Sequence, residues 1–359
     1  MKIVIIGGGV AGLAIGWRLA EAGQVVTVLE RGQPGSGATG ASAGMLAVTA
    51  ELQHSGPEEV DFAKYSNSLW PYFAKKLEAE SGRQIHFAAK GALLLARDGA
   101  ALEQLKRQAA AKLELLDPAG VRTIAPLVTG DIAGALWSPG EAQVDSRALG
   151  PALALALQKA GGQVLANEAV IRLERRSSDG RIVSAHTPFG HYSADVFVLA
   201  AGVWSSALDP VAEPVAPVKG QMIRLAPPSG QALPGPVIWG NGVYAVSRAD
   251  GLVIGATMED AGLDTATTTQ AQDYLRGAAE VLMPDLRNWT LAAHWAGLRP
   301  RAPDGLPMLG PTVVEGLWLA SGQYRNGILF APAVAETMAD QILGRASVIP
   351  AFDPRRFRA

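Results

Sequence analysis

The N-terminal stretch Met1–Glu30, MKIVIIGGGVAGLAIGWRLAEAGQVVTVLE, decides the fold of this chain of 359 residues. Lys2–Ile6 is a short β-branched apolar run that stops at three glycines, which is typical of a strand buried on both faces. A helix is expected over roughly Val10–Ala22, with Gly23 just beyond its end, and a second apolar strand over Val25–Leu29. This order of elements predicts a parallel βαβ unit.

Gly7, Gly9 and Gly12 give the unit the G-x-G-x-x-G spacing of a dinucleotide-binding turn. Gly7 permits the tight turn, Gly9 allows the backbone to approach a pyrophosphate, and Gly12 lets the helix pack against the strand. Glu30 ends the second strand, where a carboxylate accepts hydrogen bonds from an adenosine ribose, and it favours a free ribose over a 2′-phosphate. The unit therefore predicts dinucleotide binding, with a purely structural βαβ unit as the alternative.

The composition, with 48% hydrophobic and 18% charged residues, is that of a globular chain with an ample core. A net charge of −2 argues against a nucleic-acid partner. The absence of cysteine excludes disulfides, thiolate metal sites and a cysteinyl link to a cofactor. No metal is expected, because the five histidines lack the spacing of metal ligands: His54, His86, His186, His191 and His294.

The apolar N-terminus differs from a secretory signal, because Lys2 is its only flanking charge and the glycines interrupt the run early. No stretch approaches the roughly eighteen uninterrupted apolar residues of a membrane span. We therefore expect a cytoplasmic protein without a transmembrane segment.

Several further helices are indicated along the chain. Pro57–Ser81 has helical periodicity, and a helix is also expected over Ala100–Leu116. Two more are expected over Ala148–Ala160, with Asp145 as its cap, and over Thr269–Met283, with Thr269 and Gln272 in a capping box.

Residues 31–47, dense in Gly, Ala and Ser, are typical of a loop that lies against a ligand, with a linker as the alternative.

Strands complete the architecture. Val196–Leu199 and Leu317–Ala320 are apolar runs that enter small-residue turns, and a helix of about sixteen residues, opened by Gly327, follows the second. Between Pro214 and Asp260, strand hairpins without crossover helices predict an antiparallel sheet. The pattern predicts an α/β fold, a Rossmann-type domain with an inserted antiparallel-sheet domain. We place the first over residues 1–82, 146–210 and 304–359 and the second over 83–145 and 211–303, with the ligand where they meet.

Eight stretches, in the correct order, resemble the D-amino-acid oxidase family of flavoproteins, most closely its glycine oxidase branch in bacterial thiamin biosynthesis. They are GGGVAG with Glu30-Arg31, SAGML (42–46), AAGVWS (200–205), PVKGQ (217–221), VIGATM (253–258), WAGLRP (295–300), DGLPMLG (304–310) and GQYRNGILFAP (322–332). The resemblance covers nearly the whole chain.

The resemblance implies a non-covalent FAD cofactor and oxidative deamination of glycine or other small amines and D-amino acids. A hydride passes from the amine-bearing carbon to flavin N5, the product is an imine, and O2 reoxidises the flavin to give H2O2. The family also suggests a homo-oligomer. Two alternatives are a D-amino-acid dehydrogenase that passes electrons to a quinone and a flavin-binding subunit without turnover of its own.

The resemblance also assigns residues to the FAD site. Beside the glycine turn, the residues expected to line the cofactor are Val10, Ala11, Glu30, Arg31, Ala38, Thr39, Ala43, Gly44, Met45, Val170 and Gly202. The loop expected to meet the isoalloxazine ring consists of Gln323, Tyr324, Arg325, Asn326, Gly327, Ile328 and Leu329. Gly327 and its neighbours are expected to open the last helix, whose N-terminus would stabilise negative charge on the reduced flavin.

Four residues are expected in the substrate pocket: Tyr244, Met258, Arg299 and Arg325. Arg299 lies in an apolar stretch, and its planar donor fork suits an amino-acid carboxylate; the alternative is a structural pair with Asp304. For Tyr244, the alternatives are a hydroxyl that binds the carboxylate and a core residue. For Arg325, they are a substrate contact and an anchor of the loop. Met258 is expected to form part of the pocket wall. Gly242 departs from the family, in which close relatives have a histidine two residues before the tyrosine. No general base is evident, and hydride transfer from a neutral amine needs none.

Overall fold

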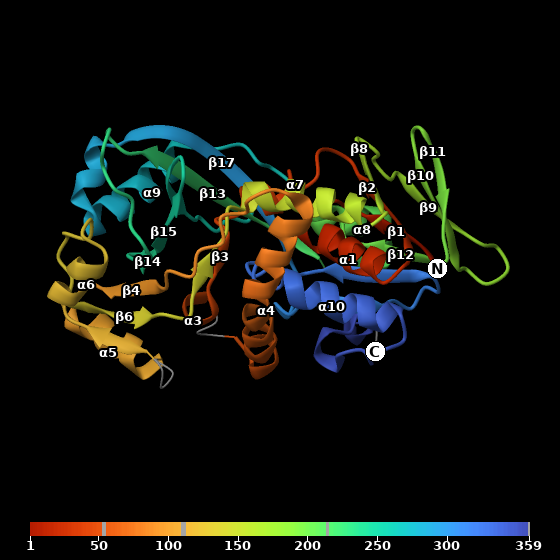
Figure 1. Ribbon diagram of the computed structural model, residues 1–359, viewed down its shortest axis with the longest axis horizontal. Coiled ribbons are helices and arrows are strands. Elements are labelled where there is room, and N and C mark those ends of the chain that lie inside the picture. Colours follow the sequence, from red (N-terminus) through yellow and green to blue (C-terminus); the bar gives the residue numbers. More distant parts are fainter. Residues whose placement is uncertain (52–54, 109–112, 213–214, 358–359) are drawn as a thin grey trace.

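The computed structural model describes residues 1–51, 55–108, 113–212 and 215–357, and its two main sheets lie at opposite ends of an elongated molecule (Figure 1). The six-stranded sheet has the order β18 (Met308–Pro311), β19 (Leu317–Ser321), β12 (Val196–Leu199), β1 (Lys2–Ile6), β2 (Val25–Glu30) and β8 (Gln163–Ala166). Its pairs are parallel except β18–β19. The expected parallel βαβ unit is confirmed.

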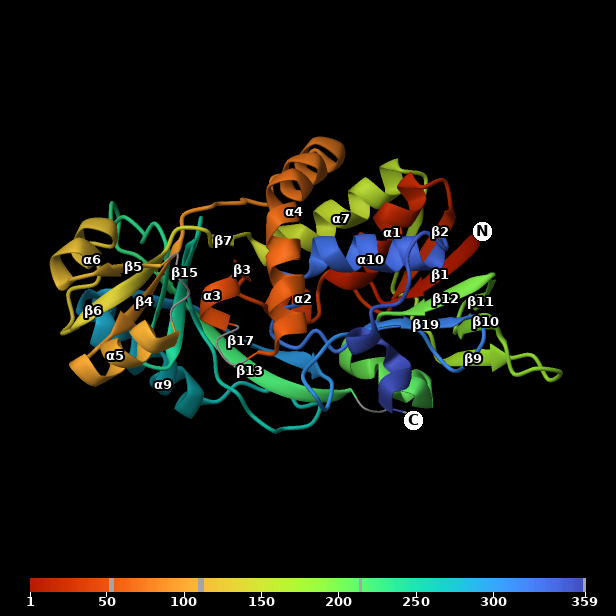
Figure 2. The same ribbon diagram turned by 90° about the horizontal axis from the view of Figure 1, so that it is seen from below.

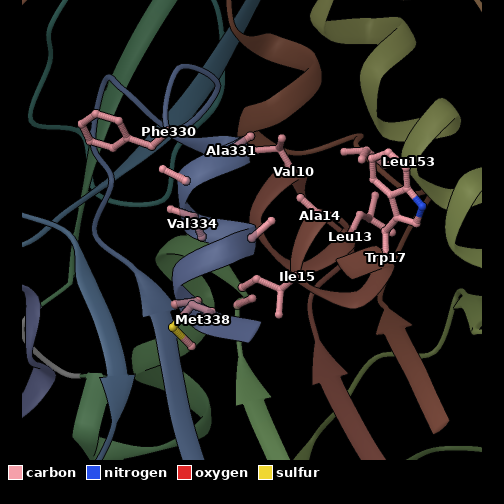
Figure 3. Close-up of a cluster of buried hydrophobic side chains, with 14 of the residues drawn as sticks. Val10, Leu13, Ala14, Ile15, Trp17, Leu153, Phe330, Ala331, Val334 and Met338 are labelled. Carbon is pink, nitrogen blue, oxygen red and sulfur yellow. The ribbon is translucent and has the colours of Figure 1, made fainter. Parts of the chain in front are cut away.

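Helices cover this sheet because their apolar faces match its buried strands. α1 (Val10–Glu21) lies between α7 (Ser146–Lys159) and α10 (Ala331–Ile342), and α4 (Pro57–Ser81) packs on both of those helices. In Figure 3, Leu13 and Trp17 of α1 point toward Leu153 of α7, and Val334 and Met338 of α10 belong to the same buried cluster. Burial of each such large side chain stabilises the fold by about 1.5–3 kcal/mol.

The eight-stranded sheet is antiparallel, as predicted, except for one parallel pair, β14–β4. Its order is β17 (Thr290–Arg301), β13 (Ala216–Ala226), β16 (Gly251–Gly255), β15 (Val243–Arg248), β14 (Val237–Gly240), β4 (Ala92–Ala96), β6 (Gly134–Ser138) and β5 (Glu114–Leu116). β13 and β17 pair from Ala216↔Arg301 to Ala226↔Thr290. This long ribbon reaches from the eight-stranded sheet into the middle of the molecule (Figures 1 and 2).

The remaining elements lie outside the two main sheets and the helices named above. They are α2 (Ala38–Ala41), β3 (Met45–Leu46), α3 (Val48–Glu51), α5 (Gly99–Gln108), α6 (Pro118–Ile124), β7 (Ala142–Gln143), the sheet of β9 (Arg172–Arg175), β10 (Ile182–Thr187) and β11 (Gly190–Ser193), α8 (Ser205–Leu208), α9 (Thr269–Leu282), and 3₁₀ turns at Gly202–Trp204, Pro210–Ala212, Pro284–Asn288, Pro350–Phe352 and Pro354–Phe357. In the described part of the chain, no helix is long and apolar enough to cross a membrane.

Asp145 caps α7 as expected, with its carboxylate accepting from Arg147 N, but α7 begins at Ser146 rather than Ala148, and other helix limits also differ from expectation. Of the helix expected over Ala100–Leu116, the described residues form α5 as far as Gln108, and residues 109–112 lie outside the described residues. Glu114–Leu116 is a strand that pairs with β6. In this segment, tertiary pairing overrides helical propensity.

The cap of α9 is Thr268 rather than Thr269, because the Thr268 Oγ1 accepts from Ala271 N at 3.3 Å. The last helix begins at Ala331 rather than Gly327 and has twelve residues rather than about sixteen. Pro332 lies in its first turn, a position that proline favours. Gly327 belongs to the preceding turn, in which Phe330 N donates to Asn326 O at 2.8 Å.

Candidate functional site

A continuous cavity of about 1040 Å³ lies between the two sheets. Its first end is lined by the glycine turn after β1 and by Glu30, and its second end by Tyr244, Met258 and Arg299. This volume is at the upper limit of the roughly 300–1,000 Å³ of ligand pockets. The cavity therefore has room for a large cofactor and a small substrate together.

The glycine turn is shaped by backbone contacts that leave no space for side chains. A Cβ on Gly7, whose φ is 112°, would overlap Ala200 O, and a Cβ on Gly12 would overlap the Gly7 carbonyl oxygen. On Gly9, by contrast, a Cβ would meet only Thr39 Oγ1 at 3.5 Å. Gly9 thus leaves backbone open to the cavity, whereas Gly7 and Gly12 permit the close packing of strand, turn and helix.

Glu30 is fixed in place by two backbone donors. Its Oε2 accepts from Gly8 N at 2.7 Å and its Oε1 from Gly32 N at 2.8 Å. A Cβ on Gly8 would lie 2.8 Å from the Glu30 Cβ, so the middle glycine of the triplet is required as well. Each carboxylate oxygen keeps a lone pair for a ribose hydroxyl. Sequence reasoning missed Gly8 and Gly32; for Gly8, the glycine triplet was the available signal.

The beginning of α1 is directed at the same end of the cavity. Val10 N donates to Thr39 Oγ1 at 2.9 Å, and the neighbouring N–H groups of the first turn lack helical partners. A helix N-terminus favours an anion such as a pyrophosphate. Nearby, the Arg31 guanidinium lies 3.4 Å from the centroid of the Trp204 ring, and both residues line the cavity. Trp204 was also missed.

The residues present fit an FAD: a glycine turn with backbone open to the cavity, an oriented carboxylate and a helix N-terminus, in a cavity that continues toward a polar pocket. Of the residues expected to contact FAD, those that line the cavity are Gly7, Gly9, Val10, Ala11, Glu30, Arg31, Ala38, Thr39, Ala43, Gly44, Met45, Val170, Gly202, Gln323, Tyr324, Arg325, Asn326, Gly327 and Ile328.

The two others lie outside the lining. Gly12 packs α1 against the glycine turn, as its contact with Gly7 shows. The Leu329 carbonyl accepts from Ser66 Oγ at 2.7 Å and from Trp70 Nε1 at 2.9 Å, which ties the 323–328 turn to α4.

At the second end, one face of β17 supports the cavity. Side chains at alternate positions of a strand point the same way, which puts Trp295, Gly297 and Arg299 on one face. Trp295 Nε1 donates to Ala41 O at 2.9 Å, and a Cβ on Gly297 would lie 2.6 Å from the Ala41 Cβ. β17 thus packs against α2, and Arg299 lies in the cavity wall.

Arg299 does not pair with Asp304, which was the structural alternative. Asp304 instead accepts from Arg356, at 2.8 and 3.0 Å. Arg299 Nη1 donates to Thr257 O at 3.2 Å. A Cβ on Gly220 would overlap the Arg299 guanidinium, so this glycine of the PVKGQ stretch provides the space in which the arginine lies.

Tyr244 is 8% exposed, lines the cavity, and has its Oη 3.9 Å from Met222 Sδ. It lies opposite Trp239, whose ring centroid is 5.1 Å away. Asn241 and Gly242 join these two strands with φ of 50° and 78°, the positive values of a two-residue type I′ hairpin.

The turn explains the glycine at position 242. Its conformation favours glycine, and a Cβ there would lie 2.7 Å from the Tyr274 hydroxyl of α9. Gly242 lines the cavity, so the phenol of Tyr274 lies directly behind this part of the cavity wall. Tyr274 lies about thirty residues further along the chain and had no signal in the motif that contains Gly242.

The 323–328 turn joins the two ends of the cavity. Tyr324 N donates to Pro300 O at 2.9 Å, and its Oη lies 3.3 Å from Met258 Sδ. Met258 is 63% exposed, which puts it on the rim of the cavity. Arg325 lines the cavity as well. The described residues of the lining include no histidine, and Glu30 is their only carboxylate.

Arg248, which sequence reasoning missed, connects the eight-stranded sheet to the cofactor end. Its side chain is buried, and its Nη2 donates to Ser42 O at 2.6 Å and to Ser146 Oγ at 3.0 Å. Its Nε lies 3.8 Å from Asp145 Oδ1. Burial lowers the pKa of the Arg248 guanidinium, but an arginine remains charged in a protein. This contact holds the 42–44 segment of the cavity wall.

Among the described residues, no group of three or more His, Cys, Asp or Glu side chains could hold a metal ion.

Known proteins resemble the chain over nearly its full length. The glycine oxidase of Pseudomonas aeruginosa is 35% identical, over 97% of this chain and 96% of that protein. The bifunctional protein ThiO/ThiG of Synechocystis is 37% identical over 99% of this chain, which spans only about half (54%) of that longer protein. The crystal structure of glycine oxidase from Geobacillus kaustophilus superposes with a TM-score of 0.91 at 31% identity, covering 99% of this chain and 98% of that one.

The family model described as DAO, FAD dependent oxidoreductase, matches residues 2–341. That range includes both sheets and both ends of the cavity. The match agrees with the glycine turn, the oriented Glu30 and the open backbone at Gly9. The chain therefore belongs to the DAO family of FAD-dependent oxidoreductases, and its cavity fits the cofactor of that family.

Proposed function

We propose that the chain catalyses the oxidative deamination of glycine and other small amines or D-amino acids, with O2 as the electron acceptor and an imine as the first product. The observation that carries this proposal is the continuous cavity, which joins a nucleotide-binding turn to a pocket with Arg299 in its wall. Relatives named glycine oxidase support the activity. Relatives named ThiO/ThiG support a role of the imine in forming the thiazole of thiamin.

In this proposal the substrate carboxylate binds to Arg299, whose planar fork can donate two parallel hydrogen bonds. Tyr244 contributes a hydroxyl at the pocket wall, Arg325 a second cation, and Met258 an apolar cover at the rim. FAD, when bound, supplies the acceptor for the hydride that leaves the substrate carbon. The chain's own contribution is to orient the carbon–hydrogen bond and to exclude water from it.

The described lining offers no base next to Arg299, since Glu30 lies at the other end and accepts from two backbone donors. The amine must therefore enter neutral or lose its proton to water. We expect kcat/KM for glycine to rise with pH until the free amine is deprotonated.

Anaerobic titration of the purified holoprotein with glycine tests the proposed activity. We expect the flavin absorbance to bleach, and to return in air with formation of H2O2. Bleached flavin that is stable in air but is reoxidised by a quinone would instead support a dehydrogenase. Flavin that no small amine bleaches would contradict catalysis altogether.

The substitution Arg299→Lys tests the pocket. Loss of a bidentate charge-assisted contact should weaken binding of a carboxylate substrate by about 2–5 kcal/mol, which steady-state kinetics would measure as a higher KM. An unchanged KM would remove Arg299 from the role.

Three further expectations stay proposals. The division into a cofactor domain (1–82, 146–210, 304–359) and a substrate domain (83–145, 211–303) is supported by the membership of the two sheets. A homo-oligomer is expected from the family resemblance, and light scattering would measure its size. The cytoplasmic location expected from the sequence stays a prediction.

A further inference from the structure

The loop of residues 256–268 connects β16 to α9 and supplies Met258, Leu263 and Thr265 to the rim and wall of the cavity. Its first half runs along β13. Lys219 N donates to Glu259 O at 3.0 Å, and Glu259 N donates to Lys219 O at 2.9 Å. The 256–268 loop is thus held at the edge of the site by the same strand that contains Gly220.

Lys219 is a buried cation beneath this loop. Its side chain is 2% exposed, and its Nζ lies 3.0 Å from Asp264 Oδ2 and 3.8 Å from Glu259 Oε2. A buried charge is costly unless it is paired, so the position of Lys219 requires these two carboxylates to stay in place. Both belong to the 256–268 loop, and the cation therefore draws the loop onto β13.

Gln221, two residues further along β13, holds the far end of the loop. Its buried amide Nε2 donates to Glu259 Oε1 at 2.9 Å and lies 3.2 Å from Thr268 Oγ1, and its Oε1 accepts from Thr268 N at 2.8 Å. Lys219 and Gln221 point to the same side of the strand, since they are two positions apart. Together they hold the loop near both of its ends.

The network reaches Arg299 through Thr257. The Thr257 hydroxyl accepts from Gln221 N at 2.8 Å and also contacts Glu259 Oε1. The Thr257 carbonyl accepts from Arg299 Nη1 at 3.2 Å. A chain of direct contacts therefore runs from Lys219 through Glu259 and Thr257 to the guanidinium in the cavity wall.

We propose that Lys219 is a positioning residue, which holds the 256–268 loop through Asp264 and Glu259 and thereby sets the place of the Arg299 guanidinium for a carboxylate ligand. This inference rests on the proposed function, because it takes Arg299 as the carboxylate-binding group. Lys219 itself is buried and is not among the described residues that line the cavity.

Lys219→Met is the most direct variant. It removes the cation but leaves two carboxylates that are 31% and 57% exposed, at Glu259 and Asp264, which water can solvate. The methionine side chain has a length and apolar character that suit the buried site. Asp264→Asn is the second variant; it keeps the lysine and weakens its closest charge partner.

The test measures the binding of acetate, a carboxylate without an amine, to the holoprotein by the change in flavin absorbance. We expect Lys219→Met to raise the Kd of acetate and the KM of glycine together, by about tenfold or more. The limiting rate of flavin reduction at saturating glycine should change less than the Kd, because a shifted guanidinium weakens ground-state binding first. Flavin content should equal that of the parent.

Lys106→Met is the matched control, since Lys106 forms a surface pair with Glu103 at 2.6 Å on α5 and does not line the cavity. A Kd for acetate in Lys219→Met within about twofold of that control would overturn the proposal, since twofold is only about 0.4 kcal/mol. If Lys219→Met does not retain flavin, the same criterion applies to Asp264→Asn. A parent protein that binds acetate but is not reduced by glycine would contradict the proposed function alone, because acetate binding needs no turnover.

Discussion

The two ends of the cavity are built in different ways. At the cofactor end, backbone groups that are close together in sequence form most of the site. Residues 7–12 form the turn, and Glu30 accepts hydrogen bonds from Gly8 N and Gly32 N. At the substrate end, side chains from β13, β15, β17, the 256–268 loop and the 323–328 turn converge. At the first end, Gly7, Gly8 and Gly12 have no space for a Cβ, whereas the second end depends on where flexible side chains are held.

Gly12→Ala should break the cofactor end and have the largest effect. Its Cβ would overlap the Gly7 carbonyl oxygen, a backbone atom that cannot move without opening the turn. We expect a loss of at least about 3 kcal/mol of folding free energy and no retained flavin. The visible absorbance of the purified protein and its thermal unfolding measure both.

Gly277→Ala is the control for this substitution. No heavy atom lies within 4 Å of the added Cβ, and the residue is exposed on α9, where alanine favours the helix by about 1 kcal/mol. A Gly12→Ala protein with full flavin content would show that the turn can open without loss of the site.

Gly220→Ala should break the substrate end without unfolding it. The added Cβ meets the far end of the Arg299 side chain, which can move aside at little cost in stability. A displaced guanidinium should raise the KM for glycine by about 10- to 100-fold. Steady-state kinetics and thermal unfolding of the same preparation separate the two effects. An unchanged KM would mean that the position of Arg299 does not limit binding.

The contrast between the two ends also explains what the sequence could predict. The glycine spacing, Glu30 and the strand–helix order act over thirty residues, so their geometry follows from local rules. Arg299 was expected from a motif, but its partner was not: Asp304 is near in sequence, while Thr257 becomes a neighbour only when β13 pairs with β17 and the 256–268 loop. The burial of Lys219 likewise depends on that pairing, since lysine is normally an exposed residue.

Tyr274→Ala should have a smaller effect, also at the substrate end of the cavity. Removing the phenol opens space behind Gly242, so the ratio of kcat/KM for N-ethylglycine to that for glycine should rise by about threefold. The effect is modest because Tyr274 is half exposed. Tyr72→Ala on α4, also an exposed tyrosine, is the control. Equal ratios in the two variants would exclude Tyr274 from substrate selection.

Tyr65→Phe should have the smallest effect, a small loss of stability. Tyr65 lies on α4, one of the helices that cover the six-stranded sheet. The hydrogen bond from Tyr65 to Glu336 at 2.6 Å, together with burial, raises the pKa of Tyr65 to about 12. The folded state then holds this proton above pH 10 while the unfolded chain loses it, so the stability contributed by Tyr65 is lost as the pH rises toward 12. The variant should be less stable by at most about 1 kcal/mol at neutral pH.

The parent and Tyr65→Phe should therefore converge in unfolding free energy at alkaline pH. Denaturant unfolding at several values of pH measures this convergence. A difference that stays constant up to the alkaline limit would show that the hydroxyl contributes packing rather than a proton-dependent bond.

The single cavity that spans both sheets has a consequence for how the protein melts. A ligand that contacts both ends adds its binding energy only while both remain folded, so each tenfold increase of free flavin above its Kd adds about 1.4 kcal/mol of resistance to unfolding. With the nucleotide in place, the two halves of the chain should come apart as one cooperative unit; stripped of it, they are free to denature in separate steps.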